Sequence, residues 1–395
     1  MKRKIVKLGD VCEIKSGGTP SRSKQEYWKD GNIPWIKIGD INSKNVSSSS
    51  EFITDLGLNN SSTKLFKKGT VLYTIFATLG EVGILDIDAT TNQAIAGILP
   101  SDELDKNYLY YFLKSKKDFV NKIGRGVAQN NINLSILRDF EIDLLPIDQQ
   151  IKIANILDQA QELIDKRKEQ IATLDKLIQS VFYDMFGDAM NSKWSKCTLT
   201  QIVKDEKHSI KRGPFGGALK KEIFVNEGYL IYEQYHAINE DFSMARYFID
   251  DKKYNELIAF KVLPGDLIIS CSGTLGKIAE LPKNARMGII NQALLKLSLD
   301  SSKMNNTYFK YLFRTEKIQD ILFGVSRGSG ISNFPPMSVI KEIGFITPPI
   351  ELQNQFAEIV ESIERQKALL NEGLIELENN FNSLMQRAFK GESLY

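Results

Sequence analysis

Two loop segments carry the residue types that bind phosphate groups. They are EIKSGGTPSRSKQEYW at residues 13–28 and HSIKRGPFGGALKKE at residues 208–222. Each combines glycines, whose backbone N–H groups can approach a phosphate, with lysine and arginine charges. Solvated turns are the alternative for either loop alone, but both halves of the chain place such a loop at the same point. The candidate nucleic-acid contacts here and nearby are Lys15, Ser16, Gly17, Gly18, Thr19, Arg22, Lys37, Lys211, Arg212, Phe215, Lys220 and Gln234.

A second matched pair of segments is rich in arginine, amides and small polar residues. RGVAQNNIN occupies residues 125–133, and SRGSGISNF occupies residues 326–334. Such side chains can contact a nucleic-acid backbone or read base edges. An ordinary turn before the next strand is an equally good interpretation. The candidates in this pair are Arg125, Gln129, Asn131, Arg327 and Ser329.

A third pair shares the letters TLG, in FATLGEVGI at residues 76–84 and SGTLGKIAE at residues 272–280. We expect Leu79 and Leu275 in the core, with Gly80 and Gly276 permitting a turn. The neighbours that differ between the copies, Phe76-Ala77 against Ser272-Gly273 and Glu81 against Lys277, are better candidates for contacts unique to each copy. The residues proposed as contacts are Thr78 and Thr274 within the shared letters, and Ser272 and Lys277 beside them.

These pairs belong to a duplication that covers most of the chain. NQA recurs at residues 92–94 and 291–293, and PIDQQIKIANILD at 146–158 is answered by PIELQNQFAEIVE at 349–361. The period is about two hundred residues, which is far longer than solenoid repeats. Each copy therefore predicts a domain with short strands first, then a helix around buried tyrosines, then a long helix that begins after proline.

The long helices repeat apolar residues at alternating steps of four and three. That spacing defines the a and d positions of a coiled coil. A helix of ~38 residues would be roughly 57 Å long. Single basic residues, Arg167 and Lys367, interrupt the two seams. The predicted seam comprises Ile153, Leu157, Ile164, Ile171, Leu174, Ile178, Phe356, Val360, Ile363, Leu370, Leu374, Leu377 and Phe381.

The heptad pattern leaves two packing arrangements open. Each helix could pack on its own domain, as amphipathic helices commonly do. A narrow heptad stripe fits better with the two helices pairing with each other, antiparallel, with the copies related by a pseudo-two-fold axis. The predicted fold class is therefore α+β: two mixed α/β domains separated by two long helices that pair as an antiparallel coiled coil.

Catalytic and metal-binding motifs are missing from the sequence. The only two histidines, His208 and His236, occupy unmatched positions, and the three cysteines lie far apart without CxxC spacing. There is no Walker-type GxxxxGK[ST] phosphate loop, which argues against an NTPase. Lysine and arginine total 51 against 49 acidic residues, so net charge neither demands nor excludes nucleic acid. We expect a binding protein without catalytic or metal-ligating residues, and neither secretion nor a membrane span.

With these residues in view, the chain resembles the specificity subunit of a type I restriction-modification system. The resemblance is carried by KLGDVCEIKSGGTP, NIPWIKIGDI, the TLG and NQA phrases, the P-[IL]-x-x-Q helix starts, and the endings VFYDMFGD and LMQRAFKGE. It implies two target recognition domains, at 1–145 and 191–347, that each read half of a bipartite DNA site. It also implies helical regions at 146–190 and 348–395 that set the gap.

The resemblance further implies which partners the chain has. The helices would dock two methyltransferase (modification) subunits, which carry S-adenosylmethionine, and restriction subunits with ATP and Mg²⁺ would join them in the cytoplasm. No cofactor would be bound by this chain. Three other interpretations stay open: a stand-alone DNA-binding regulator, a fragment of a fused recognition and cleavage enzyme, and a coiled-coil adaptor without DNA contact.

Overall fold

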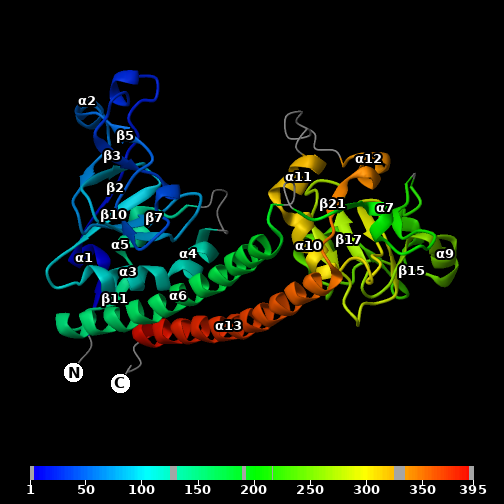
Figure 1. The fold of residues 1–395 in the computed structure, drawn as a ribbon. Coiled ribbons are helices and arrows are strands. Elements are labelled where there is room, and N and C mark those ends of the chain that lie inside the picture. The colour runs from blue at the N-terminus through cyan, green and yellow to red at the C-terminus, as the bar shows by residue number, and fades with distance from the viewer. Residues whose placement is uncertain (1–3, 125–130, 189–192, 216, 324–333, 391–395) are drawn as a thin grey trace. The chain divides into compact units, whose positions relative to one another are not determined.

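The chain folds into two compact units. The computed structural model describes residues 4–124, 131–188, 193–215, 217–323 and 334–390. Unit 1 comprises Met1–Glu169 with Asn371–Tyr395, and unit 2 comprises Gln170–Leu370. Each unit contains one set of sheets and parts of two long helices, α6 (Ile147–Phe186) and α13 (Ile350–Lys390) (Figure 1).

Unit 1 contains two larger sheets and one strand pair. The first sheet has the strand order β2-β10-β7-β8-β4, antiparallel except for β4 with β8, and the second has the order β5-β3-β9-β6, with β3 and β9 parallel. The pair is β1 with β11. The strands are β1 (Ile5–Lys7), β2 (Cys12–Ser16), β3 (Ile33–Ile36), β4 (Asn45–Val46), β5 (Phe52–Ile53), β6 (Leu65–Phe66), β7 (Val71–Thr74), β8 (Val82–Leu85), β9 (Ala89–Thr91), β10 (Ile95–Pro100) and β11 (Glu141–Asp143).

Unit 2 repeats this topology except that its first sheet, among the described residues, has no counterpart of β4. Its first sheet has the order β13-β20-β17-β18, its second β15-β14-β19-β16 with β14 and β19 parallel, and its strand pair is β12 with β21. The duplication inferred from the sequence is thus a duplication of strand order. The strands are β12 (Lys196–Thr198), β13 (Ile210–Arg212), β14 (Tyr229–Tyr232), β15 (Phe248–Ile249), β16 (Lys261–Val262), β17 (Leu267–Ser270), β18 (Ile278–Glu280), β19 (Gly288–Ile290), β20 (Leu294–Leu297) and β21 (Gly344–Ile346).

Shorter helices connect the strands. In unit 1 they are α1 (Leu8–Val11), η1 (Gln25–Tyr27), η2 (Ile38–Asp40), α2 (Asp55–Asn59), α3 (Lys106–Ser115), α4 (Lys117–Gly124) and α5 (Leu134–Arg138). In unit 2 they are α7 (Leu199–Ile202), η3 (Lys221–Ile223), α8 (Gln234–Asn239), α9 (Asp251–Glu256), η4 (Ile258–Phe260), α10 (Asn306–Arg314), α11 (Glu316–Phe323) and α12 (Met337–Glu342). Within the described residues, no helix is long and apolar enough to cross a bilayer.

The two long helices pair antiparallel, as the heptad pattern predicts. In unit 1, Leu157 and Ile164 from the first half of α6 share a core with Phe381 from the second half of α13. In unit 2, Ile178 from the second half of α6 shares a core with Phe356 from the first half of α13. Early α6 therefore meets late α13 in one unit, and the reverse holds in the other, which only antiparallel helices allow.

Each helix pair also packs on its own unit, so both arrangements left open by the sequence occur together. The ring of Tyr111 in α3 lies 6.2 Å from that of Phe381, and the ring of Tyr308 in α10 lies 5.8 Å from that of Phe182 in α6. Tyr108, Tyr111 and Tyr308 are fully buried. These tyrosines belong to the core, as expected from their helical spacing.

The basic residues in the seams have specific partners. Lys367 Nζ lies 2.5 Å from Asp175 Oδ1 on α6 and 3.0 Å from Glu364 Oε1 on its own helix. Arg167 lies over Gly373, where a Cβ atom would collide with the guanidinium. The lysine thus meets acidic residues on both helices, and the guanidinium of the arginine lies against the backbone of Gly373.

A buried glutamine explains the P-[IL]-x-x-Q start of each long helix. Gln150 Oε1 accepts from Asp105 N (2.8 Å), and Gln150 Nε2 donates to Leu145 O (2.7 Å) and to Glu103 O (2.8 Å). Gln353 makes the equivalent bonds to Asn305 N (2.8 Å), Pro348 O (2.8 Å) and Lys303 O (3.2 Å). Each glutamine fixes the residue that caps α3 or α10 and so joins the long helix to its unit.

Candidate nucleic-acid interface

In unit 1 the sequence-predicted loops converge at one end of the first sheet. Gly17 N donates to Ile95 O (3.0 Å), Ile75 N donates to Ala94 O (2.8 Å), and Thr19 Oγ1 bonds Gln93 Oε1. The loops after β2, after β7 and between β9 and β10 are thereby brought side by side. Segments far apart in the sequence form one surface because the strands that carry them are neighbours in the sheet.

Unit 2 builds the same surface with other side chains. Gly213 N donates to Leu294 O (2.9 Å), and Cys271 N donates to Ala293 O (2.7 Å). Gln234, at the start of α8, lies beside Gly273. The backbone frame is shared between the units, so differences in what they bind must come from the side chains that the frame presents.

The TLG turns have the conformation expected from their glycines. Gly80 has a φ of +83° and Gly276 a φ of +72°, a region that favours glycine. Leu79 is buried and Leu275 is half-buried. In each turn a strand hydroxyl accepts from the following backbone: Thr74 Oγ1 from Glu81 N and Ser270 Oγ from Lys277 N. Thr78, Ser272, Thr274 and Lys277 are exposed.

Glycine at the two basic loops also has a packing reason. A Cβ atom at Gly17 would overlap Thr91, and one at Gly213 would overlap the Asn291 carbonyl. Gly17 and Gly18 are buried. Close approach of the loop to its own sheet is therefore enough to require glycine, and direct contact of Gly17 or Gly18 with DNA stays a prediction.

Three of the basic candidates in unit 1 pair with carboxylates. Glu51 Oε2 lies 2.5 Å from Arg22 Nη1, and Glu51 Oε1 lies 2.6 Å from Lys37 Nζ. Hydrogen bonds from these two cations lower the pKa of Glu51. Lys15 is exposed and pairs with Glu13.

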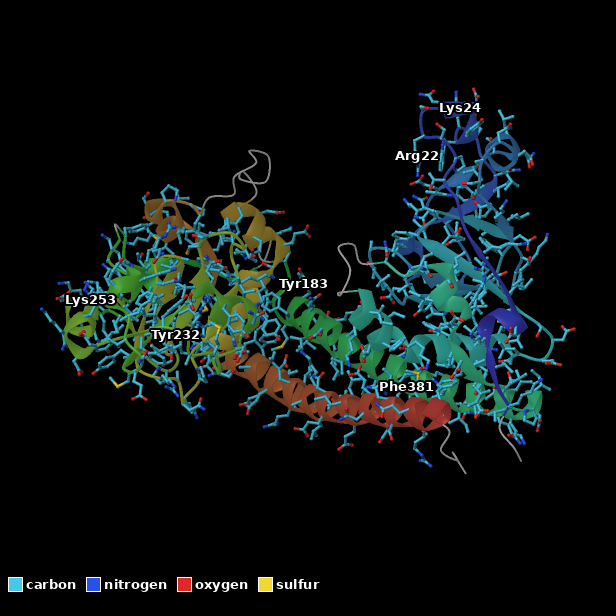
Figure 2. The ribbon with its side chains drawn as sticks, turned by 180° about the vertical axis from the view of Figure 1, so that it is seen from behind. Arg22, Lys24, Tyr183, Tyr232, Lys253 and Phe381 are labelled. Carbon is cyan, nitrogen blue, oxygen red and sulfur yellow. The ribbon has the colours of Figure 1, made fainter. Side chains whose placement is uncertain are left out.

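Aromatic rings complete the site around Arg22. Its guanidinium carbon lies 3.6 Å from the centroid of the Trp28 ring and 4.8 Å from that of Trp35, a cation–π arrangement. Figure 2 shows Arg22 and Lys24 at the end of unit 1 opposite Phe381. An arginine stacked on an indole and fixed by a carboxylate is preorganised for contact with a flat or anionic partner.

Arg212 in unit 2 is held in a different way. Its guanidinium carbon lies 5.3 Å from the centroid of the Phe215 ring and 5.4 Å from that of Phe334. Arg212 Nε is buried and has no hydrogen-bond partner among the described residues. Phe215 is 67% exposed, and Lys220 is exposed as well. A cation stacked between rings without a carboxylate can bind an anion without first breaking an ion pair.

Of the candidates in the second matched pair of segments, the structure describes only Asn131. Arg125, Gln129, Arg327 and Ser329 lie outside the described residues. Asn131 is half-buried and forms an isolated β-bridge with Phe76, which places it beside the first TLG turn.

Two kinds of residue at this surface were missed from the sequence. Gln93 and Gln292 are exposed at equivalent positions between β9 and β10 and between β19 and β20. The NQA repeat that contains them indicates the duplication, but nothing in it indicates that the glutamine side chains are exposed at this surface. Trp28 was missed because nothing in the linear sequence places its ring under Arg22.

No metal centre is visible among the described residues, where no group of three or more histidine, cysteine, aspartate or glutamate side chains could hold an ion. His236 is buried, with Nδ1 accepting from Glu233 N (2.9 Å) and Nε2 3.0 Å from Met244 O. Both of its ring nitrogens therefore have structural partners.

Comparison with known proteins gives the family. The model for the type I restriction modification DNA specificity domain matches residues 2–175 and 216–379. The chain belongs to this family. The first match contains all the strands of unit 1, and the second contains those of unit 2 from β14 onward. The family domain therefore occurs twice, and the resemblance stated from the sequence is confirmed.

Individual relatives agree with this assignment. The MjaIX specificity subunit of a type I restriction enzyme from Methanocaldococcus jannaschii is 26% identical over 386 residues, which is 91% of this chain and 86% of the relative. The EcoR124I/EcoR124II specificity subunit from Escherichia coli is 28% identical over 193 residues, 47% of each chain. A chain in a structure that concerns complex assembly and conformational transition of the type I R-M system aligns over 99% of this chain and 98% of its own length, with a TM-score of 0.65 and 16% identity. At that identity the likeness concerns the fold.

Proposed function

We propose that this chain is the DNA-recognition subunit of a type I restriction-modification complex, in which each sheet system reads one half of a bipartite site. The observation that carries the proposal is that one backbone frame occurs twice with different exposed side chains. Arg22, Lys37 and Gln93 lie on one copy, and Arg212 and Gln292 lie on the other. Arginine and glutamine are the side chains that hydrogen-bond guanine and adenine edges.

The pairing of α6 with α13 supports a role for the helices in fixing the gap between the half-sites. We take 1–145 and 191–347 as the recognition domains and 146–190 and 348–395 as the helical regions. The helices also expose large apolar residues, among them Leu163 (54%), Leu369 (69%) and Ile375 (60%). Large apolar side chains exposed along a helix are candidates for protein–protein contacts. We assign these residues to the docking of two modification subunits.

Catalysis belongs to the partners in this proposal. The modification subunits would bind S-adenosylmethionine and methylate adenine, and restriction subunits would use ATP with Mg²⁺. This chain contributes recognition, which fits the lack of catalytic motifs in its sequence.

The test is to express the chain with its modification subunit and to map the methylated bases in the host DNA. A split motif with a fixed, unspecified gap is expected. Replacement of residues 191–347 by another recognition domain should change one half of the motif and leave the other. Methylation without a split motif, or no binding of the purified complex to DNA, would refute the proposal and favour a regulator or an adaptor.

A second experiment tests the gap. One heptad inserted into both α6 and α13 preserves the a/d register. It should widen the unspecified gap and leave the bases read unchanged. An unchanged gap in a folded, active variant would show that the helices do not set it.

A further inference from the structure

One lysine of unit 2 is largely buried. Lys296 lies in the middle of β20 and is 6% exposed. Among the described residues, no hydrogen bond or ion pair reaches its ammonium group. Both oxygens of the nearby Asp266 are engaged, since Oδ1 accepts from Ser298 Oγ (2.5 Å) and Oδ2 accepts from Leu263 N (2.8 Å). Its Nζ atom is not among the fully buried atoms that lack a partner, so the ammonium group keeps contact with solvent while its stem is buried.

The nearest side chain across the sheet is another lysine. Lys211 in β13 is the direct cross-strand partner of Lys296, and both side chains lie on the same face. Like charges placed directly opposite each other are destabilising. Lys211 Nζ lies 4.8 Å from the centroid of the Phe260 ring, and Lys261 follows Phe260 in the chain. Three lysines thus gather at one edge between the two sheets.

A fourth lysine and a histidine extend the cluster. Lys204 N donates to Ser298 O (3.0 Å), two residues beyond Lys296, and His208 immediately precedes Ser209, which accepts from Ser298 N (2.8 Å). Burial and the charges of Lys261 and Lys204 lower the pKa of Lys296, whereas Asp266 and Glu206 oppose them. Burial is thus the main cause of the lowered pKa, and both acidic and basic side chains lie around this partly enclosed ammonium.

Unit 1 shows that the fold does not require this cluster. The position equivalent to Lys296 is Gly97, where a Cβ atom would overlap the Phe66 ring. The equivalent of Lys211 is Lys15, which pairs with Glu13. Leu65 occupies the position of Lys261. The cluster is thus a property of unit 2 alone.

We propose that Lys296, with Lys204, Lys211 and Lys261 around it, forms a phosphate-binding site that holds a backbone phosphate of DNA beside the half-site read by unit 2. The proposal rests on the proposed function of the chain. Lys211 is followed by Arg212, so the site continues the recognition surface around the edge of β13. Phosphate contacts of this kind position a protein on the duplex and carry no sequence information.

The experiment uses the full chain assembled with its modification subunit and a duplex that carries the motif mapped for the wild type. Lys296→Met keeps the apolar stem and removes the charge. We expect roughly five-fold weaker binding and a slope of log K against log salt that is smaller by about 0.9, as for one lost phosphate contact. The methylated bases should stay the same. Lys303→Met, which removes an exposed lysine paired with Asp300, is the control and should change neither quantity.

Surface variants and a competitor separate the possible causes. Lys211→Gln combined with Lys261→Gln should lower the salt slope without touching a buried position. Inorganic phosphate at constant ionic strength should compete with wild-type DNA binding and lose that effect in Lys296→Met. Phosphate binding without any change in the DNA slope would assign the site to a small anion and overturn the DNA contact. Loss of subunit assembly with unchanged DNA binding would overturn it in favour of an acidic protein partner.

The two proposals fail in different ways. If the wild-type complex binds no bipartite DNA, the proposed function falls. If it binds and the folded Lys296→Met complex has the wild-type salt slope, only the phosphate site falls.

Discussion

The two recognition units present different chemistry on one backbone frame. In unit 1, Glu51 holds both Arg22 and Lys37. In unit 2, Arg212 and Lys296 have no carboxylate partner among the described residues. A cation in an ion pair is fixed in position, but its carboxylate partner must be displaced before it can bind a DNA phosphate. A cation without such a partner can bind the phosphate directly. Buried packing and hydrogen bonds maintain the shared backbone frame in both units. The exposed side chains can therefore differ between the units, and with them the affinity and selectivity for DNA.

The largest expected effect tests the part that the units share. Gln150→Leu and Gln353→Leu each remove the hydrogen-bond partner of one backbone N–H and of two backbone carbonyls. Each should therefore lower the free energy of unfolding of its unit by about 3 kcal/mol. Hydrogen exchange of α3 and α10 would show the loss unit by unit. Gln149→Leu and Gln355→Leu, at exposed neighbouring positions, are the controls and should be nearly neutral. A large effect in one unit only would show that the two helix junctions are not equivalent.

The next effect separates the two binding surfaces. Arg212→Gln removes an unpaired cation and should weaken DNA binding by about 10- to 100-fold, in the range for loss of an arginine contact. Arg22→Gln should weaken it by only about three- to ten-fold, because binding through Arg22 must first compete with Glu51. Titration of both variant complexes with the same duplex gives the ratio of their dissociation constants. A larger loss for Arg22→Gln would reverse the comparison.

A smaller effect concerns how unit 1 is attached to its helix. Lys44 Nζ lies 2.6 Å from Asp158 Oδ1 on α6, and the Tyr111 hydroxyl donates to the same oxygen (2.5 Å). Lys44→Met should destabilise unit 1 by about 1 kcal/mol, measured by chemical denaturation. Lys68→Met, which removes an exposed pair with Asp86, is the control. Equal losses in both variants would show that the Lys44 pair does not join the sheets to α6.

The smallest effect is a pH dependence common to both units. Burial raises the pKa of Cys12 and of Cys271 to about 12. An unfolded thiol ionises near its ordinary value of about 8.5, so the native state should lose stability as pH rises from there toward 12. Melting temperatures of the wild type and of Cys271→Ala across this window should converge at high pH. Curves that stay parallel would mean that ionisation of Cys271 is not linked to folding.

The sequence was sufficient for the features that depend on local periodicity and repetition. The heptads predict α6 and α13, and the repeated phrases predict two equivalent units. The sequence did not reveal the roles of Gln150 and Gln353, because each bonds a residue more than forty positions away. It named Arg22 and Arg212 as similar candidates, yet the partner that distinguishes them, Glu51 or an aromatic pair, is set by non-local strand pairing. Lys296 was overlooked because a lysine in a strand normally faces solvent.

The division of the long helices has a consequence for synthesis of the chain on the ribosome. Unit 1 contains residues up to Glu169 and then residues from Asn371 onward. Its core therefore lacks Phe381 and Ala388 until all of unit 2 has been translated. Unit 2 is continuous in sequence and can close earlier. A nascent or truncated chain that stops before Asn371 would leave Leu157, Ile164 and Tyr111 uncovered. Such a chain would display an apolar surface to chaperones and proteases until the second half of α13 covers it.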